Sequence, residues 1–286
     1  MSLPAFFSEY QQPVHAELER VVGGDRSEVD RAMAYTALAP SKQVRAVLVL
    51  LCAELCRGTA ARAVPAAAAI ELVHASSLVL DDLPCMDDAP LRRGRPANHL
   101  EFGEPVAILA AFGLLNLAYG SLARAYEPPV ASRMTSIIAD AVGPSGLIGG
   151  QALDLEATDR QIDFETLERI HRGKTGALFV AAAACGALTA GAAAEPIAAL
   201  SAYAKNLGLA FQIVDDLLDV SGDPSETGKA VRADARKTTF VSFSGVDGAR
   251  QLAAELCETA DRALAPFGAK ADRLRELSAF VAARRL

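Results

Sequence analysis

A chain of 286 residues with 51% hydrophobic and 22% charged residues has enough apolar surface to bury a large core. These values exclude a disordered protein and a small disulfide-stapled scaffold, and the length suits one large domain or about two smaller ones. The 28 basic and 35 acidic residues leave a net charge of −7, so the overall charge does not favour nucleic acid or an anionic membrane surface as a partner. An anionic substrate therefore needs a local cluster of basic residues.

Cysteine usage predicts a reducing compartment. The cysteines are odd in number and scattered, and they lack the two-residue spacing and neighbouring histidines of a zinc site. The first residues show no basic stretch followed by an apolar run, so we expect no secretory signal and a cytoplasmic protein. The five cysteines are Cys52, Cys56, Cys85, Cys185 and Cys257.

Two uncharged stretches, Val106 to Ala123 and Ala177 to Ala194, are long enough to be tested as membrane spans. Asn116 and Ser121 interrupt the first, and the second consists mostly of alanine and glycine, which insert weakly. We therefore expect both to be buried core helices and predict no membrane span.

Helical periodicity runs through the chain. Apolar residues recur at intervals of three and four, as in Val44, Val47, Leu48 and Leu51, while β-branched runs that alternate with period two are missing. Together with the many alanines, this pattern predicts an all-α protein. No linker-like composition divides it. The predicted helices span approximately 6–22, 26–36, 42–57, 64–82, 105–124, 129–146, 163–190, 195–220, 246–265 and 269–284.

The first of two polar, turn-rich segments, residues 84–104, follows a helix that ends in aspartates. On a continuous helix Asp81 and Asp87 would point to different faces, but Pro84 ends or bends the helix and can swing Asp87 back. A solvated acidic helix end is the alternative, although carboxylates at a helix C-terminus oppose the macrodipole. Carboxylates this close repel one another unless cations neutralise them. The four carboxylates of this first cluster are Asp81, Asp82, Asp87 and Asp88.

The second segment, residues 221–239, also follows a helix that ends in aspartates, namely Asp215, Asp216 and Asp219. Asp215 and Asp219 are four residues apart and share one helical face. Carboxylate oxygens without histidine or thiolate suit a hard cation, and a few carboxylates with retained waters suit Mg²⁺ better than Ca²⁺. The two clusters therefore predict opposite walls of one site that magnesium ions bridge.

Basic residues accompany both acidic clusters. Taken singly, each is more often a solvated surface charge than a ligand contact. Next to carboxylates that hold magnesium, however, they form the pattern expected of a protein that handles a diphosphate. They are Arg92, Arg93 and Arg95 after the first cluster, Lys229, Arg236 and Lys237 after the second, Lys42 and Arg45 at a helix start, and Lys174 before Thr175.

The first acidic region, with Glu71 to His74 before it and Leu91 to Pro96 after it, resembles that of the trans-polyprenyl (isoprenyl) diphosphate synthases of the bacterial and plant branch. The segment Phe211 to Asp219 is similar to their second aspartate-rich region. The resemblance covers nearly the whole chain in the same order. Further matches are Lys42 with Arg45, Gly149 to Asp154, Ile170 to Gly176, Gly228 with Lys229, and Asp234 with Lys237 to Phe240.

The resemblance implies one domain over residues 1–286, an all-helical fold around a deep central cavity, and usually a homodimer. The implied reaction is a head-to-tail condensation of isopentenyl diphosphate with an allylic diphosphate. Ionisation leaves a diphosphate anion and an allylic cation, and metal and guanidinium groups stabilise the charge that grows on the leaving group. The double bond of isopentenyl diphosphate then attacks the cation, and a proton is lost.

The resemblance also implies roles for individual residues. Asp81, Asp82, Asp87, Asp215 and Asp219 would bind Mg²⁺, as three ions per site once substrate is bound. The allylic diphosphate would contact Arg92, Lys174, Lys229 and Lys237. Isopentenyl diphosphate would contact Lys42, Arg45, His74 and Arg93, and Thr175 and Gln212 would face the carbocation. His74 lies two helical turns before Asp81, which favours the site over a core role for this histidine.

Three positions depart from the family pattern. Gln43 stands in Ser-Lys-Gln where Gly-Lys-Arg is common, Phe112 stands in Ala-Phe-Gly where many members have Gly-Asp-Ala, and Arg232 replaces a glycine-containing loop. None removes a metal or diphosphate ligand. We therefore expect them to affect efficiency and loop geometry rather than the reaction.

Product length is expected to depend on Ser76 and Ser77, which lie about one turn before Asp81. In the family an aromatic residue at either position typically stops growth at farnesyl diphosphate, so these small residues predict geranylgeranyl diphosphate. Farnesyl diphosphate is the alternative if Phe112 or Leu115 closes the cavity. Less favoured alternatives are a terpene cyclase, whose second metal site normally mixes Asn, Ser and Glu, and a non-catalytic subunit of a heteromeric synthase.

Overall fold

The all-α prediction is confirmed by the computed structural model, which describes residue 4 and residues 6–221 and 237–283. Lys229, Arg232 and Asp234 lie outside these residues. The elements are α1 (Phe7–Val22), α2 (Glu28–Ala37), α3 (Val44–Leu55), α4 (Ala60–Asp81), β1 (Leu91–Arg92), β2 (Arg95–Pro96), α5 (Asn98–Phe102), α6 (Glu104–Ala125), α7 (Pro128–Val142), α8 (Leu147–Ala157), α9 (Phe164–His171), a π-helix η1 (Arg172–Gly176), α10 (Ala177–Thr189), α11 (Ala194–Ser221), α13 (Phe240–Ala263), a 3₁₀-helix η2 (Ala265–Ala271) and α14 (Asp272–Ala282).

Most helix ends agree with the sequence pattern, and the differences have local causes. The sequence pattern does not predict α8, because glycines near the start of this helix weaken its helical propensity. The predicted helix 163–190 is continuous but contains the π-helix η1. The predicted helix 246–265 begins earlier in the structure, at Phe240. The added first turn joins the rest of α13 at Gly245, whose φ of 69° breaks the helical geometry.

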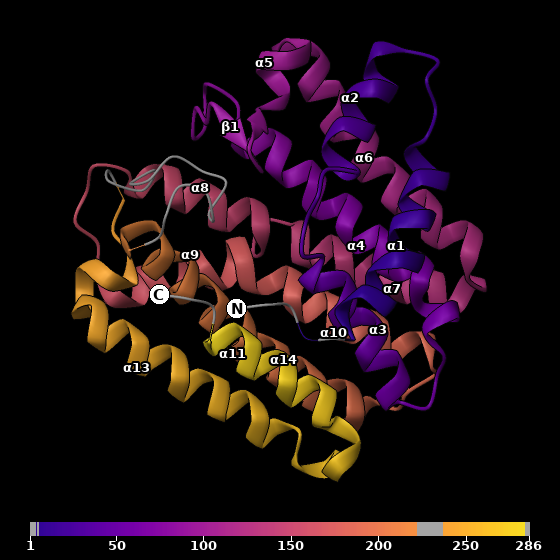
Figure 1. Cartoon of the computed structure of the whole chain (residues 1–286), viewed down its shortest axis with the longest axis vertical. Coiled ribbons are helices and arrows are strands. Elements are labelled where there is room, and N and C mark those ends of the chain that lie inside the picture. Colours follow the sequence, from indigo (N-terminus) through magenta and orange to yellow (C-terminus); the bar gives the residue numbers. More distant parts are fainter. Residues whose placement is uncertain (1–3, 5, 222–236, 284–286) are drawn as a thin grey trace.

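The centre of the core is formed by α3, α4 and α10. Residues Ala46 to Ala53 of α3 are all buried, and α10 is buried at nearly every position. α3 packs against both α4 and α10, whereas α11 packs between α10 and α13 (Figure 1). Small alanine side chains let these helices approach closely, and the packed bundle is a rigid base for the loops that follow α4 and α11.

The two stretches tested as membrane spans differ in burial. The stretch beginning at Ala177 forms α10, which is a buried core helix as predicted. α6 is not, because one of its faces is open: Ile108, Leu109 and Phe112 are 38%, 56% and 64% exposed. By length and composition alone, three helices of the described chain, α4, α6 and α11, are apolar enough to cross a membrane.

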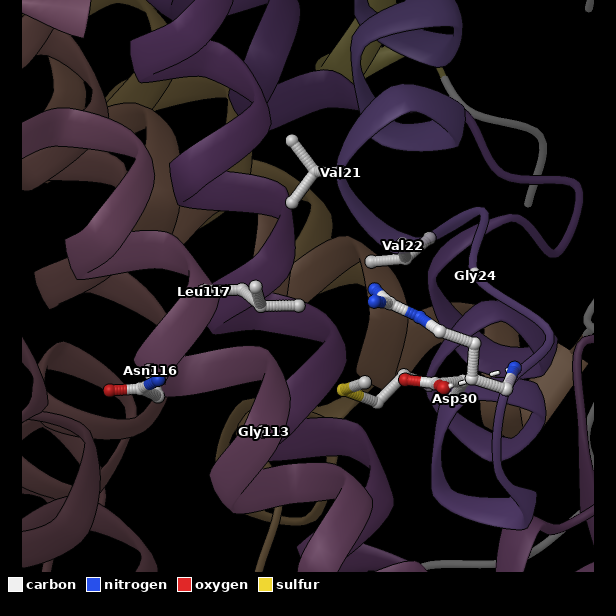
Figure 2. Close-up of a pocket in the computed structure, with 9 residues that line it drawn as sticks. Val21, Val22, Gly24, Asp30, Gly113, Asn116 and Leu117 are labelled. Carbon is white, nitrogen blue, oxygen red and sulfur yellow. Dashed lines mark hydrogen bonds between the residues drawn. The ribbon is translucent and has the colours of Figure 1, made fainter. Parts of the chain in front are cut away.

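Beside the open face of α6 lies a pocket of about 240 Å³ between α6 and the α1–α2 connection (Figure 2). Met33 and Leu117 contribute apolar walls, and Arg26 and Asp30 stand at its polar side. None of the predicted site residues lines it. The lining residues are Val21, Val22, Gly24, Arg26, Asp30, Met33, Gly113, Asn116 and Leu117.

Candidate active site

The first aspartate cluster folds back on itself as Pro84 predicts. α4 ends at Asp81, and the backbone N–H of Asp87 donates to the carbonyl of Asp81 at 2.9 Å. The same turn is closed by the Met86 N–H, which donates to the Leu83 carbonyl at 2.9 Å. Burial raises the pKa of Asp81, with Asp87 adding to the shift and Lys174 opposing it. The turn therefore gathers negative charge in a partly desolvated place.

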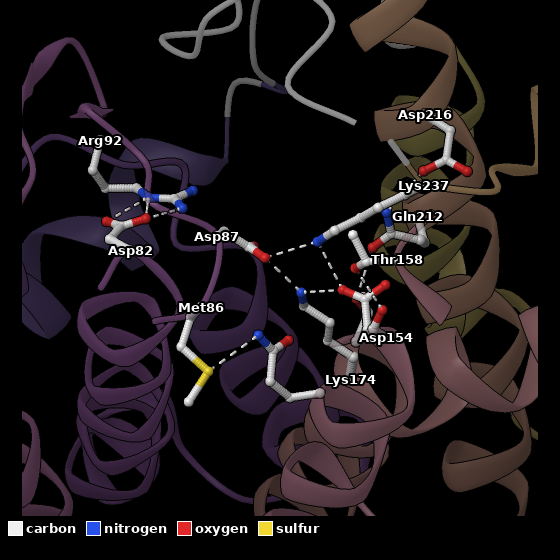
Figure 3. Close-up of polar contacts among 12 residues, drawn as sticks. Asp82, Met86, Asp87, Arg92, Asp154, Thr158, Lys174, Gln212, Asp216 and Lys237 are labelled. Atoms are coloured by element: carbon white, nitrogen blue, oxygen red, sulfur yellow. Dashed lines mark hydrogen bonds and ion pairs between the residues drawn. The ribbon is translucent and has the colours of Figure 1, made fainter. Parts of the chain in front are cut away.

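The Asp82 carboxylate points away from Asp81 and Asp87 and binds the guanidinium of Arg92. This carboxylate is 2% exposed, and the Arg92 Nε lies 3.0 Å from each of its oxygens, with a second guanidinium nitrogen also bonded. Arg92 belongs to the β1–β2 hairpin, whose central residues Arg93 and Gly94 have φ of 55° and 74°, the geometry of a type I′ turn. The hairpin thereby fixes Arg92 beside the aspartates (Figure 3).

Two lysines and two carboxylates form the centre of the site (Figure 3). Lys174 Nζ lies 2.8 Å from Asp154 Oδ2 and 3.6 Å from Asp87 Oδ2. Lys237 Nζ lies 2.9 Å from the same Asp154 oxygen and 2.8 Å from Asp87 Oδ1. Burial opposes the charge on Asp154, but the two lysines outweigh burial and lower its pKa. The network brings together four segments that are far apart in the sequence.

Lys174 and Thr175 occupy the π-helix η1, a type of local widening that is often found at functional sites. α8 approaches this turn so closely that a Cβ on Gly150 would lie 2.2 Å from the backbone nitrogen of Lys174. A Cβ on Gly173 would lie 2.8 Å from the Gly146 carbonyl oxygen. Glycine at both positions is what lets α8 place Asp154 against Lys174.

Thr175 and Gln212 are in direct contact. The Thr175 hydroxyl donates to Gln212 Oε1 at 2.7 Å, and Gln212 Nε2 donates to Asp216 Oδ1 at 2.9 Å. Asp216 is 2% exposed, and its other oxygen accepts the backbone N–H of Phe240 at 3.0 Å. Asp215 and Asp219 are partly buried and share the Gln212 face of α11, as their spacing predicts.

A second basic region lies at the start of α3. The Gln43 backbone is left-handed with a φ of 47°, the Lys42 carbonyl accepts from Gln11 Nε2 at 2.9 Å, and Glu71 Oε1 accepts the Ala46 N–H at 3.2 Å. Thus α1 and α4 hold this turn, although Gln43 provides no side-chain cap.

Arg45, in the first turn of α3, is a partly desolvated cation. Its guanidinium carbon lies 4.6 Å from the ring centroid of Phe179, and its Nη1 lies 3.4 Å from His74 Nε2. Its buried Nε has no hydrogen-bond partner within the part of the chain that the structure describes, and burial lowers the pKa of Arg45. Arg93 donates to the Ala39 carbonyl at 3.3 Å nearby. Such groups fit an anion such as a phosphate.

The acidic residues offer the hard oxygen donors that Mg²⁺ prefers. Within the described ranges, however, no three acidic, histidine or cysteine side chains already converge as a complete metal site. Asp81 and Asp87 of the first cluster and Asp215 and Asp219 of the second are the carboxylates that could hold such an ion.

Comparison with known proteins gives the family. The polyprenyl synthetase profile matches residues 26–262. The chain belongs to the polyprenyl synthetase family. It is 40% identical to a dimethylallyltranstransferase of Fischerella ambigua, over 99% of this chain and 84% of that protein. It is 37% identical to a farnesyl diphosphate synthase of Geobacillus stearothermophilus, over 99% and 98%, and 42% identical to a chloroplastic geranylgeranyl pyrophosphate synthase of Arabidopsis thaliana, over 90% and 74%.

Solved structures agree with this assignment to the polyprenyl synthetases. A geranylgeranyl pyrophosphate synthetase of Pyrococcus horikoshii has a TM-score of 0.88 at 30% identity and covers 98% of both chains. A geranyltransferase of Helicobacter pylori, complexed with magnesium and isoprenyl diphosphate, has a TM-score of 0.83 at 27% identity, covering 98% of this chain and 97% of that one. The protein is therefore a prenyltransferase that makes a short-chain trans-prenyl diphosphate from isopentenyl diphosphate and an allylic diphosphate.

Two carboxylates of this polyprenyl synthetase were missing from the residue roles expected from the sequence. From the sequence, Asp154 belongs only to a segment that resembles the family, and Asp216 only to its acidic cluster. The sequence offers one signal for Asp154: it lies four residues after Gly150 and therefore shares a helical face with this glycine. The role of Asp216 depends on its contact with Phe240 N–H, 24 residues away, and no local pattern indicates it.

The serines before Asp81 face different neighbours. Ser76 is 5% exposed and its hydroxyl donates to the Ala111 carbonyl of α6 at 2.8 Å, so it lies in the α4–α6 contact. Ser77 is half-buried, donates to the His74 carbonyl at 2.9 Å, and shares the helical face of Asp81. Phe112 is exposed on α6, which corrects the idea that this ring closes the cavity of its own chain.

Proposed function

We propose that this enzyme makes geranylgeranyl diphosphate, uses three Mg²⁺ ions per site, and works as a cytoplasmic homodimer. The observation that supports the diphosphate chemistry best is the pair of lysines, Lys174 and Lys237, held together at Asp87 and Asp154. Two cations kept so close to carboxylates that suit magnesium fit a polyanion with bound metal. The magnesium named for the Helicobacter pylori geranyltransferase supports the choice of metal.

In this proposal Asp81, Asp87, Asp215 and Asp219 hold the metal ions, which supply Lewis-acid stabilisation of the leaving diphosphate. Lys174, Lys237 and Arg92 donate to its oxygens, with Lys229 as a further expected contact. Asp82 changes its role: because both of its oxygens bond Arg92, we assign it to orienting that guanidinium rather than to the metal.

Isopentenyl diphosphate is assigned to the basic region at the start of α3. Lys42, Arg45 and Arg93 supply cations there, and His74 contacts Arg45 on the face of α4 that leads to Asp81. The carbon chain then starts between the two regions, next to Thr175 and Gln212, whose oxygens face the developing allylic cation. Phe179 and Phe211, with ring centroids 5.3 Å apart, provide apolar surface next to Arg45.

The proposed reaction is tested by three incubations with dimethylallyl, geranyl or farnesyl diphosphate. With Mg²⁺ and isopentenyl diphosphate, we expect a longer prenyl diphosphate. With excess EDTA we expect none, because the carboxylates repel a diphosphate when no cation lies between them. Without isopentenyl diphosphate we also expect no elongated product. Full turnover in EDTA contradicts the metal assignment. A hydrocarbon released from the allylic substrate alone indicates a cyclase instead.

Product length is tested at Ser77. Phenylalanine at this position places a ring one turn below Asp81, so Ser77→Phe is expected to shorten the main product by one isoprene unit. Ser76→Phe instead overfills the α4–α6 contact, so it is also expected to lower the melting temperature. Chromatography of the dephosphorylated products measures the change, and an unaltered length in Ser77→Phe means that the wall lies elsewhere.

The homodimer is supported by the open apolar face of α6. Ile108, Leu109 and Phe112 form an exposed stripe with a helical spacing, which a monomer in water does not favour. We expect light scattering to give twice the 29.9 kDa of one chain, and Phe112→Asp to give monomers. A wild-type protein that is monomeric at micromolar concentration contradicts this proposal. The cytoplasmic location is supported by the five free cysteines.

A further inference from the structure

Asp216 belongs to a chain of hydrogen bonds that runs from Thr175 through Gln212. Thr175 donates to Gln212 Oε1 at 2.7 Å, and Gln212 donates through Nε2 to Asp216 Oδ1 at 2.9 Å. The second Asp216 oxygen accepts the Phe240 N–H, the first N–H of α13, at 3.0 Å. With 2% of its surface exposed, this carboxylate is accessible neither to solvent nor to a ligand in the site.

The two hydrogen bonds that Asp216 accepts, from Gln212 and from the Phe240 N–H, fix which way the Gln212 amide points. A carboxylate only accepts hydrogen bonds, so the amide group next to it must present its NH₂. The Gln212 carbonyl oxygen is then directed to Thr175, whose hydroxyl can donate to it. An uncharged neighbour that both donates and accepts would allow either orientation of the amide.

The orientation of Gln212 has a direct electrostatic effect on the reaction that we propose. An amide oxygen that faces the developing allylic cation stabilises it, whereas the NH₂ group would bring partial positive charge toward it. Preorganised dipoles of this kind act where water is excluded and need no rearrangement during the reaction. Asp216 lies behind Gln212, away from the Thr175 contact, and acts through the amide.

We propose that Asp216 is a positioning residue that orients the Gln212 amide so that its oxygen faces the allylic cation. This inference rests on the proposed function, in which Gln212 and Thr175 face that cation. It gives the two neighbouring aspartates of α11 separate tasks: in the proposed function Asp215 holds metal, whereas Asp216 accepts hydrogen bonds from Gln212 and the Phe240 N–H. The first cluster repeats the pattern, with Asp82 directed to Arg92.

The variant Asp216→Asn tests this directly. The oxygen of the introduced amide is expected to accept the Phe240 N–H, which leaves the new NH₂ group facing Gln212 and turns the Gln212 amide around. We expect kcat to fall about 10²-fold, in line with the loss of one preorganised dipole, while the KM values for both substrates stay within about threefold. The exposed carboxylate of Asp247 on α13 provides a control, and Asp247→Asn is expected to match the wild type.

Binding of two analogues separates orientation from a structural role. An allylic ammonium compound with inorganic diphosphate imitates the cation, and a thiolodiphosphate imitates the unreacted substrate. The first should bind Asp216→Asn about 10²-fold more weakly, in proportion to the expected fall in kcat, and the second equally well. Equal weakening of both overturns the proposal, because it indicates a general loss of the site.

A paired exchange keeps the test valid if Asp216→Asn folds poorly. Gln212→Glu alone places two carboxylates together and should be almost inactive. Adding Asp216→Asn to it restores a donor beside the new carboxylate, so the double variant should be at least about tenfold more active than Gln212→Glu. If the second change lowers activity further, Asp216 does not act through residue 212. A wild-type enzyme without prenyltransferase activity would refute the proposed function instead.

Discussion

Replacing Asp81 or Asp215 with alanine is expected to lower kcat by at least about 10³-fold. Each carboxylate belongs to one of the two acidic clusters. Its loss removes a preorganised negative charge that, in the proposed function, holds a metal ion before the diphosphate leaves. Burial raises the pKa of Asp81, and the positive charge of Lys174 opposes this shift, so the carboxylate lies in a partly desolvated place where a nearby cation stabilises its charge. Steady-state turnover with saturating substrates and Mg²⁺ measures the effect.

Asp88 provides the matched control for this prediction. It belongs to the same cluster and is exposed, but its backbone is left-handed with a φ of 47°, a conformation that asparagine tolerates better than alanine. Asp88→Asn should therefore keep turnover within about twofold of the wild type. If Asp81→Ala stays within tenfold of the wild type, Asp81 is not a metal ligand.

Gly150→Ala is expected to lower kcat/KM by about 10²-fold or more. The new methyl group would lie 2.2 Å from the Lys174 nitrogen and 2.8 Å from the Gly173 carbonyl carbon, so the backbone of α8 or of the π-helix must move. That movement shifts Lys174 and Thr175, and a misplacement of about 1 Å is enough for a loss of this size. The overpacking also costs about 1–3 kcal/mol of stability.

Activity and a thermal melt together check this prediction. The melting temperature should fall, yet the protein should remain folded at about 25 °C, so the kinetic loss can be measured on native protein. Ala152→Ser, two residues further along α8 on an exposed position, is expected to change neither quantity. Wild-type kinetics in Gly150→Ala would mean that the close contact between α8 and the π-helix is not needed for catalysis.

The sequence alone was sufficient for the helical class, for most helix positions and for the turn at Pro84. These features depend on local physics: apolar spacing of three and four residues, and the inability of proline to continue a helix. The return of Asp87 to the Asp81 carbonyl follows from the same local cause. The resemblance to the polyprenyl synthetases then supplied the reaction.

The open face of α6 shows where apolar periodicity is insufficient. The helix is apolar nearly all around, which reads as a core helix in the sequence. Burial depends, however, on which helices of the same chain are available to cover it, and the neighbours α2, α4, α5 and α7 leave one side of α6 exposed. The exposed side is the one that we assign to a second copy.

What the sequence determined by itself was which charged groups this enzyme possesses and at which helix ends they occur. Only the tertiary structure decided which aspartate of each neighbouring pair turns to a partner on another element, because adjacent residues on a helix point about 100° apart and the packing on either side selects between them. Asp82 turns to Arg92 on a hairpin and Asp216 to the first N–H of α13. Each of these partners comes from another element, and no spacing along α4 or α11 reveals it.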